Sequence, residues 1–441
     1  MSASRRKLKQ CHIKGRKKDR SGTSCRTPEA VVTITTLGHR GHGIAEADTE
    51  RLFVPYSLPT ETVRVKVTGD YGEIIEIIEA AEDRIDPACP HFGQCGGCAV
   101  QHMQEGTYYE WKRGIVTTAL LHQGLDVDVE PVVDAHGAGR RRVTLHVVRQ
   151  GALVQVGFMQ ARSHNLSDIQ VCPVLAPAFS DAIDLAHELG NSLLVPARGL
   201  DVQLTATEAG LDCHVIGTRT IKAGGYDQHM ALADLAERYD LARLTLDGEM
   251  VVERRKPQLR IGGALVTVPV GAFLQATQEG ERILSGLVTD HMVAANSQSV
   301  ADLFCGIGPY ALHLAEQAKV FAADNDAASI EALAAAFRHT QNLKPAETVA
   351  RDLFDNPLTV DELNGVDLVV FNPPRAGASA QAAEIALSQV PDVISVSCDP
   401  ATFARDARIL VEGGYGLERV TPVDQFKWAA HVEVVGFFRR R

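Results

Sequence analysis

The sequence lacks the features that define several large classes of protein. No apolar run in its 441 residues approaches the roughly 18 residues that span a bilayer. The N-terminus, MSASRRKLKQ, has no apolar core of a secretory signal. Nine cysteines are too few for a disulfide scaffold, and 45% hydrophobic with 22% charged residues excludes a collagen-like or wholly disordered chain. We therefore expect a cytoplasmic protein of roughly two to four globular domains.

Charge is distributed unevenly along the chain. Residues 1–28 hold ten Lys or Arg and a single acid, whereas the whole chain has 44 basic and 55 acidic residues. The body is therefore acidic, and residues 1–29 form a basic tail without aromatic residues. Such a tail is typical of a disordered arm that contacts polyanions. The alternatives are a solvated tail without a partner, or a translation start assigned too far upstream.

Residue patterns divide the remainder into three parts. Short strand-like runs crowd residues 30–88, which predicts a small β-barrel of the OB kind. Residues 89–262 begin with a Cys- and Gly-rich stretch, continue with a helix at 107–123 that is able to pack on the last domain, and end in an antiparallel α+β pattern. Strands and helices alternate through residues 263–441, which predicts an α/β, Rossmann-like doubly wound sheet.

The start of this α/β region has the pattern of a nucleoside site. In ADLFCGIGPYAL, Gly306 and Gly308 follow a buried strand, where a glycine lets a ligand approach the backbone. Asp324 ends the next strand, in position to accept hydrogen bonds from ribose hydroxyls, and Asp352 follows a third strand, near an adenine edge. Without a third glycine or a P-loop lysine, the pattern favours S-adenosylmethionine over a pyrophosphate. The alternative is a plain glycine turn.

Two further strand ends carry polar residues. FNPPRAG places Asn372 and Arg375 after one strand, and SCDPATFARD places Cys398 after another. A cysteine there points into the cleft of a doubly wound sheet. A helix starting near Thr402 directs the positive end of its dipole at Cys398, which favours the thiolate. The alternative is a buried structural cysteine.

These motifs resemble those of a known family. The chain resembles the S-adenosylmethionine-dependent uridine-5 RNA methyltransferases, in the subgroup with an N-terminal TRAM domain and an iron–sulfur cluster. The similarity runs from about residue 31 to the end. It is carried by the strings CPHFGQCGGCAVQH, GAFLQAT, DLFCGIG, NPPRAGA, SCDPATFARD and DQFKWAAHVEVV.

The resemblance implies roles for individual residues. Cys398 would attack C6 of uracil, and Glu433 would later remove the C5 proton so that Cys398 can leave. His431 is the next candidate for this base. Gln275 would hold the methionine end of the cofactor, and Phe304 would lie near it.

Two positions depart from the family pattern. Asn372 stands where the family usually has an Asp that helps to hold the target base and the cofactor, so the resemblance implies a cofactor contact for Asn372 as well. Pro309 stands where the family often has a small polar or amide residue. Asn372 would also suit an enzyme that methylates an exocyclic amine, but such an enzyme needs neither Cys398 nor Glu433. A non-catalytic RNA-binding factor on the same scaffold is a third interpretation.

Four cysteines have the spacing of a metal site. Cys89, Cys95 and Cys98 form C-x5-C-x2-C, and Cys172 lies in VCPVL. Four thiolates can bind zinc or an iron–sulfur cluster, and one triplet with a distant fourth cysteine fits a cluster better than zinc. The resemblance implies [4Fe–4S]; unligated thiols are the remaining alternative.

RNA is the partner that the resemblance implies. The barrel and the cysteines favour large-subunit (23S) ribosomal RNA over the tRNA T-loop, although tRNA remains an alternative. Arg140, Arg141, Arg142 and the segment Arg162–His164 are candidates for phosphate contacts, with solvated charge as the alternative. The sequence indicates neither a membrane segment nor a protein partner.

Overall fold

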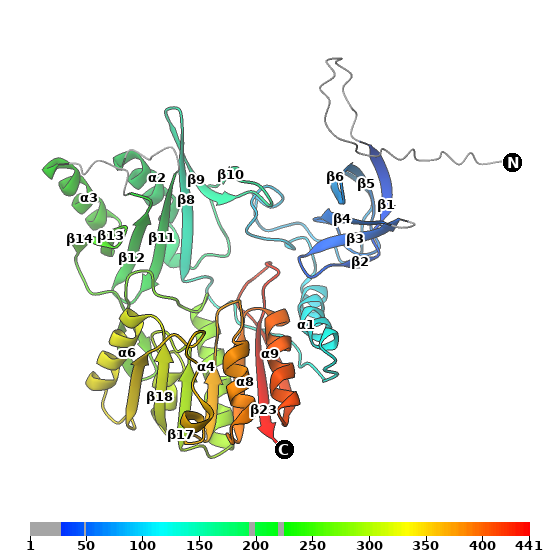
Figure 1. Ribbon diagram of the computed structural model, residues 1–441. Helices are drawn as coiled ribbons and strands as arrows, with labels where there is room; N and C mark the ends of the chain where they lie inside the picture. Colours follow the sequence, from blue (N-terminus) through cyan, green and yellow to red (C-terminus); the bar gives the residue numbers. More distant parts are fainter. Residues whose placement is uncertain (1–27, 48–49, 194–198, 219–224) are drawn as a thin grey trace, which may run out of the picture.

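The computed structural model describes residues 28–47, 50–193, 199–218 and 225–441. The basic tail expected at 1–29 therefore lies almost wholly outside the described residues. The described chain forms three large sheets, which Figure 1 shows as separate bodies. None of the described helices is both long enough and apolar enough to cross a membrane.

The first sheet is six-stranded, in the order β1-β5-β6-β4-β3-β2. Its strands are β1 (Glu29–Thr33), β2 (Thr36–Leu37), β3 (His42–Ala47), β4 (Glu50–Pro55), β5 (Thr62–Thr68) and β6 (Tyr71–Glu79). β1 and β2 are consecutive in the chain but lie at opposite ends of this order, so the sheet closes on itself. Val54, Val63 and Val65 fill its interior. The result is a small six-stranded barrel, as the short strand-like runs of residues 30–88 predicted.

The central domain is built on a seven-stranded sheet in the order β10-β9-β8-β11-β12-β13-β14. Its elements are β8 (Arg142–Gln150), β9 (Leu153–Met159), β10 (Leu166–Asp168), the 3-10 helix η1 (Pro177–Phe179), α2 (Ala182–Ser192), β11 (Leu200–Thr207), β12 (Gly210–Ile216), α3 (Tyr226–Arg238), β13 (Leu241–Leu246) and β14 (Glu249–Glu253). All neighbours are antiparallel except β12 and β13. Helices α2 and α3 contact each other and the sheet.

The C-terminal domain has an eight-stranded sheet in the order β19-β18-β17-β20-β21-β23-β22-β7. Its strands are β17 (Ser299–Leu303), β18 (Lys319–Asp324), β19 (Ala346–Ala350), β20 (Leu368–Phe371), β21 (Asp392–Ser397), β22 (Tyr415–Asp424), β23 (Glu433–Arg440) and the early β7 (Val133–Asp134). The strands from β19 to β21 are parallel, whereas β23 is antiparallel to both of its neighbours. The α/β sheet predicted from the sequence is thus confirmed.

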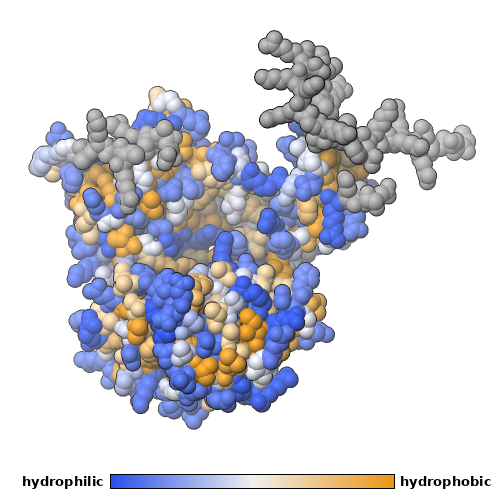
Figure 2. All heavy atoms as spheres, viewed as in Figure 1, coloured by the Kyte–Doolittle hydropathy of each residue, from blue (hydrophilic) through white to orange (hydrophobic). Residues whose placement is uncertain are grey.

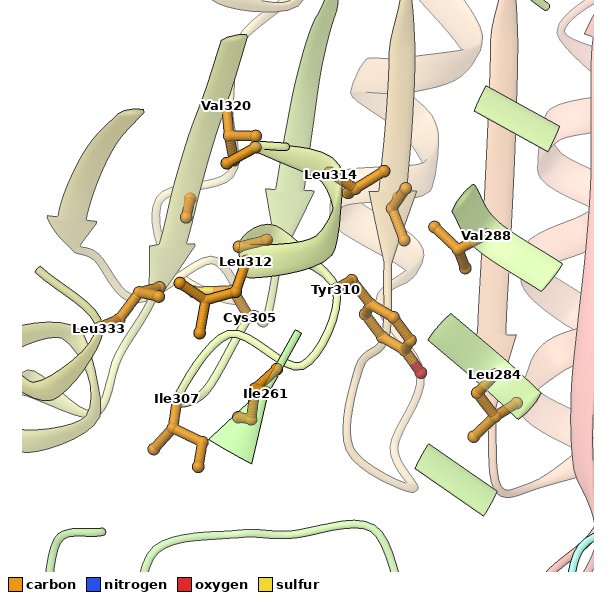
Figure 3. Close-up of a cluster of buried hydrophobic side chains, with 14 of the residues drawn as sticks. Ile261, Leu284, Val288, Cys305, Ile307, Tyr310, Leu312, Leu314, Val320 and Leu333 are labelled. Carbon is orange, nitrogen blue, oxygen red and sulfur yellow. The ribbon is translucent and has the colours of Figure 1, made fainter. Parts of the chain in front are cut away.

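Helices cover both faces of this sheet. One core contains side chains of α4 (Gln278–Ala294), α5 (Ala311–Leu314) and α6 (Ala327–His339), and Figure 3 shows part of it around Tyr310. A second core contains side chains of α1 (Glu105–His122), α7 (Val360–Leu363), α8 (Ser379–Leu387) and α9 (Pro400–Glu412). Each cluster also includes alternate residues of the parallel strands, because successive side chains of a strand point to opposite faces. The sheet is therefore doubly wound.

Three early segments belong to this C-terminal domain. α1 buries Val116 and Leu120 in the second core and contacts α9, and β7 pairs with β22. The hairpin of β15 (Gln258–Ile261) and β16 (Ala264–Thr267) packs in the first core. Apart from α1 and β7, the continuous part of this domain therefore begins a few residues before the expected 263. The inner side of β15 is buried against this domain rather than against the central sheet.

Candidate active site

Two strand ends bring the cysteine and the glutamate together. Cys398 follows the last residue of β21, and Glu433 is the first residue of β23. These strands are antiparallel neighbours in which Ser397 pairs with Val434. The start of one strand therefore lies beside the end of the other, although the two residues are far apart in the sequence. Glu433 is only 3% exposed, while Cys398 is partly exposed.

Burial controls the protonation of Glu433. It raises the pKa of the carboxyl to about 7, against the opposing effects of a hydrogen bond from Gln425 and the charge of Arg375. Gln425 Nε2 lies 3.0 Å from Glu433 Oε1. A carboxyl with a pKa near neutrality exchanges a proton readily at physiological pH, which is the property required of a general base.

The thiol of Cys398 differs from the sequence-based expectation. Burial, together with the neighbouring Glu433, raises its pKa to about 11, and Arg375 only partly opposes this shift. The expectation that the helix dipole favours the thiolate is therefore wrong. Helix α9 begins at Pro400, and the side chain of Asp399 caps it by accepting hydrogen bonds from the N–H groups of Ala401 and Thr402. The cap places a negative charge at the helix end that was expected to stabilise the thiolate.

His431, the second candidate for the base, lies in the segment before β23, two residues ahead of Glu433. Its Nε2 is 3.2 Å from Arg375 Nη2. Burial and the charge of Arg375 lower the pKa of His431 to about 4, so the ring is neutral near pH 7. Lys112 Nζ also donates to the His431 carbonyl oxygen, which fixes the backbone here.

The glycine motif forms an open strand end. Gly306 has φ 53° and donates its N–H to Asp324 Oδ2 at 2.9 Å. A Cβ at Gly306 would meet no atom within 4 Å, so the backbone is open to a ligand there. Gly308 has a different reason to be glycine, because a Cβ would lie 2.4 Å from Leu333 Cδ1. The first glycine thus opens the site and the second allows α6 to pack against the turn.

Two aromatic rings lie beside this strand end. Phe304 follows β17 with φ 60°, and its ring centroid is 5.4 Å from that of Phe354. Asp352, beyond β19, accepts a hydrogen bond from Phe354 N through Oδ1 at 2.9 Å. The sequence reasoning included Phe304 and Asp352 but missed Phe354, which is 41% exposed. An exposed aromatic two residues after a strand-end acid was the available signal.

A second missed residue is Asp302 in β17. It is fully buried, and neither carboxylate oxygen makes a well-formed hydrogen bond in the described part of the chain. Burial raises the pKa of Asp302 to about 8. Asp302 lies near the end of β17, four residues before Gly306, and the backbone N–H of Ala311 partly opposes the rise in its pKa. The signal in the sequence was an acid inside the otherwise apolar run VADLF.

Gln275 lies in the loop before α4 and is 2% exposed. Its side chain already has partners, because Oε1 accepts from Gln425 Nε2 at 2.7 Å and Nε2 is 3.4 Å from the Tyr310 hydroxyl. Asn372 follows β20, and its backbone N–H bonds the carbonyl of Leu303 at 3.1 Å. Asn372 therefore borders the end of the β17–β20 pair, whereas the contacts of Gln275 are with Gln425, after β22, and with Tyr310, before α5.

The four cysteines surround one cavity. Cys89, Cys95, Cys98 and Cys172 all line a space of about 440 Å³ between the Cys-rich loop and the central sheet. All four are free thiols. In the described residues, no group of three or more Cys, His, Asp or Glu side chains is close enough to hold a metal ion. The four are thus gathered but not in ligating geometry.

A groove of about 1040 Å³ runs from the barrel past the Cys-rich loop to His431. Figure 2 shows the hollow between the barrel, the central domain and the C-terminal domain. Glu73 is the only acid among the described lining residues. The basic lining residues are Arg40, Lys66, Arg84, Arg140, Arg162 and Arg375.

Only some of the arginines predicted to contact phosphate line the groove. Arg140 and Arg162 line the groove, and Arg162 stacks 3.6 Å from the ring centroid of Tyr71. Arg141 is buried in an ion pair with Glu281, so its candidacy was wrong. Arg142 donates to backbone carbonyls of the loop before Gln275 and lines the cysteine cavity instead. Alternation along the chain explains why Arg141 is buried while Arg140 and Arg142 both line the cysteine cavity, since successive side chains point to opposite faces.

A doubly wound sheet with an open glycine strand end and acids on the adjoining strands defines an α/β methyltransferase fold. The family model described as tRNA (Uracil-5-)-methyltransferase matches residues 242–441. An RNA methyltransferase of Brucella suis biovar 1 (strain 1330), described as uncharacterized, is 43% identical over 94% of this chain and 98% of its own. A similarly described one from Caulobacter vibrioides is 42% identical, covering 93% and 99%. The chain belongs to this family of RNA methyltransferases.

Among solved structures, the chain is similar to the Pyrococcus abyssi tRNA (uracil-54, C5)-methyltransferase in complex with S-adenosyl-L-homocysteine. The TM-score is 0.72, with 20% identity over 92% of this chain and 99% of the other. This likeness supports the fold over nearly the whole length of both chains.

Proposed function

We propose that the protein transfers a methyl group from S-adenosylmethionine to C5 of a uridine in RNA, through a covalent bond between Cys398 and C6. The observation that carries the proposal is the pairing of Cys398 and Glu433 at adjoining ends of β21 and β23. An enzyme that methylates an amine needs neither residue. A non-catalytic protein would have no use for a buried acid with a pKa of about 7.

The residues of the chain fit the proposed cofactor. Gly306 leaves the strand end open, Asp302 is a buried acid near the end of β17, and Phe304 with Phe354 offers aromatic faces to a nucleobase. Asp324 at the end of β18 would bind the ribose hydroxyls. When bound, S-adenosylmethionine supplies the electrophilic methyl group.

The reaction needs two proton movements. Cys398 is partly exposed and gives its thiol proton to solvent water as Sγ bonds to C6, and the electrons of the C5–C6 double bond move to give an enolate. Arg375, whose charge opposes the raised pKa of Cys398, stabilises the anionic sulfur. Once C5 carries the methyl group, Glu433 takes the C5 proton. The C5–C6 double bond then reforms as the C6–Sγ bond breaks, and the departing thiolate takes up a proton from solvent to restore the thiol.

RNA containing 5-fluorouridine tests this sequence of steps. Fluorine at C5 cannot be removed as a proton, so the reaction should stop at a covalent complex. Intact-mass analysis should show protein plus RNA plus one methyl group, and Cys398→Ala should show no complex. If the wild-type protein methylates uridine RNA but forms no complex with the fluorinated RNA, the covalent mechanism is wrong.

We propose 23S ribosomal RNA as the substrate, and a tRNA T-loop as the alternative. The large basic groove between three domains suits a folded RNA of considerable size. The family model and the Pyrococcus abyssi enzyme are both named for tRNA, which favours the alternative. Nucleoside mass spectrometry of separated 23S rRNA and tRNA from a deletion strain decides, because only the true substrate loses 5-methyluridine.

For the cysteine cavity we propose a [4Fe–4S] cluster that shapes the RNA groove. Support comes from the convergence of all four cysteines on one cavity and from Cys98, which also lines the groove. Backbone N–H groups of Ala99 and Val100 donate to the carbonyl of Trp428, so the Cys-rich loop also holds the segment before β23. Anaerobically purified protein should contain about four irons per chain. Zinc instead of iron would make the metal assignment wrong.

A further inference from the structure

Gln425 occupies the centre of a buried hydrogen-bond network that the mechanism above does not use. Its Nε2 lies 2.7 Å from Gln275 Oε1 and 3.0 Å from Glu433 Oε1. Its Oε1 accepts from Thr277 N at 3.3 Å. Gln425 is 1% exposed. Both amide hydrogens and the amide oxygen thus have protein partners.

The orientation of this amide is determined by its neighbours. Because Oε1 accepts the Thr277 N–H, the NH₂ group must face the two oxygens of Gln275 and Glu433. A flipped amide would place its oxygen against two acceptors and its NH₂ against a donor. The space is tight as well, since a Cβ at Gly280 would lie 2.7 Å from Gln425 Oε1.

The backbone around Gln425 is held just as firmly. The preceding Asp424 is fully buried and pairs with Lys112 Nζ at 2.9 Å and His136 Nε2 at 3.0 Å. The hydroxyl of Tyr108 also donates to it. Helix α1 therefore fixes the end of β22, from which Gln425 reaches the start of β23.

We propose that Gln425 is a positioning residue for the removal of the C5 proton. It holds one oxygen of Glu433 and ties that carboxyl to Gln275, so that the base keeps a fixed orientation before the substrate arrives. The proposal rests on the proposed role of Glu433 as base. A base held in place has less motion to lose when the substrate binds.

The pH dependence of the reaction reports on this contact. The groups that face Glu433 are Gln425, the charged Arg375, the thiol of Cys398 and the phenol of Tyr310. Of these, the Gln425 hydrogen bond and the Arg375 charge lower the pKa of Glu433. Loss of the Gln425 donor should therefore raise that pKa further.

The test is Gln425→Met, which keeps the length and volume of the side chain and removes its hydrogen bonds. With unmodified 23S rRNA and tRNA transcripts, the acid limb of the kcat–pH profile should move up by about one pH unit. Labelled methyl should accumulate in a covalent complex at about pH 6. The matched control is Gln381→Met, since Gln381 is equally buried but bonds only the backbone of Leu358 in the described structure.

The outcomes separate the two proposals. If Gln425→Met keeps the wild-type pH profile, or if Gln381→Met shifts it equally, the positioning role is overturned. In a Glu433→Gln background, Gln425→Met should have no further effect on resolution of the complex. If Glu433→Gln alone turns over normally, the assignment of the base fails instead, independently of Gln425. Melting temperatures of the two Met variants show whether both remain folded.

Discussion

Replacing Glu433 by Gln should stabilise the protein in a pH-dependent manner. The carboxyl is buried, and its pKa rises from 4.5 to about 7 on folding. Each pKa unit corresponds to about 1.4 kcal/mol, so the ionised carboxylate should destabilise the folded state by about 3 kcal/mol. Gln has nearly the same shape and no charge. The variant therefore loses this penalty without leaving a cavity.

The sign and the pH window follow from proton linkage. An acid with a raised folded-state pKa holds its proton more tightly when folded, so stability falls as the pH rises between the two pKa values. The penalty is absent below about pH 4.5 and complete above about pH 7. Melting curves of Glu433→Gln and wild type should coincide near about pH 4.5. They should differ by several degrees in favour of the variant at about pH 8.

A matched control, Glu281→Gln, should change the stability of the protein in the opposite direction. Glu281 is also buried, but it pairs with Arg141, so Glu281→Gln leaves a buried cation without its partner and should lower the melting temperature. Glu433→Gln should also stall with a methylated covalent RNA complex that survives denaturing gels, since loss of a general base costs roughly 10²–10⁴ in rate. Equal melting temperatures of wild type and Glu433→Gln at both pH values would refute the account of the buried carboxyl.

Three further predictions concern other groups of the site. Arg375→Met should raise the pKa of Cys398, because Arg375 is the group that lowers it, so the rate of complex formation with 5-fluorouridine RNA should need a higher pH. Lys112→Met should cost about 3–5 kcal/mol in the free energy of unfolding, because it removes the cation from buried Asp424, and a lowered melting temperature should show this. Cys98→Ser should lose bound iron by elemental analysis, and retention of the full iron content would exclude Cys98 as a ligand.

Much of the fold was visible in the alternation of elements. The parallel strands from β17 to β21 are short apolar runs bounded by turn residues, and such runs mark strands buried on both faces. The membership of α1 and β7 was harder to predict. β7 has only two residues, and α1 shows little contrast between an apolar and a polar face and even buries Lys112. Long-range pairing decides such cases, and local pattern carries little information about it.

The candidate site was predictable where function requires a residue at a strand end, as for Cys398 and Gly306. It was not predictable where a side chain acts through contacts made in three dimensions. In the sequence Gln425 is an ordinary polar residue, and only the fold shows that the ends of β22 and β23 place it against Glu433. The thiol pKa of Cys398 was misjudged for the same reason. The helix dipole was apparent from sequence, whereas the depth of burial of the thiol and the effect of the Glu433 charge on its pKa were not.

The early position of α1 and β7 has a consequence for dividing the protein into fragments. The Tyr108–Asp424 contact joins residues 316 positions apart, with the central domain inserted between the two sides of the C-terminal domain. A fragment starting at residue 263 would expose the apolar surface that Val116 and Leu120 cover and leave the edge of β22 unpaired. Closing so long a loop costs entropy, which a compact insertion reduces by bringing its two ends together. The central domain thus links the early segments α1 and β7 to the rest of the C-terminal domain, and removing it would separate these two parts.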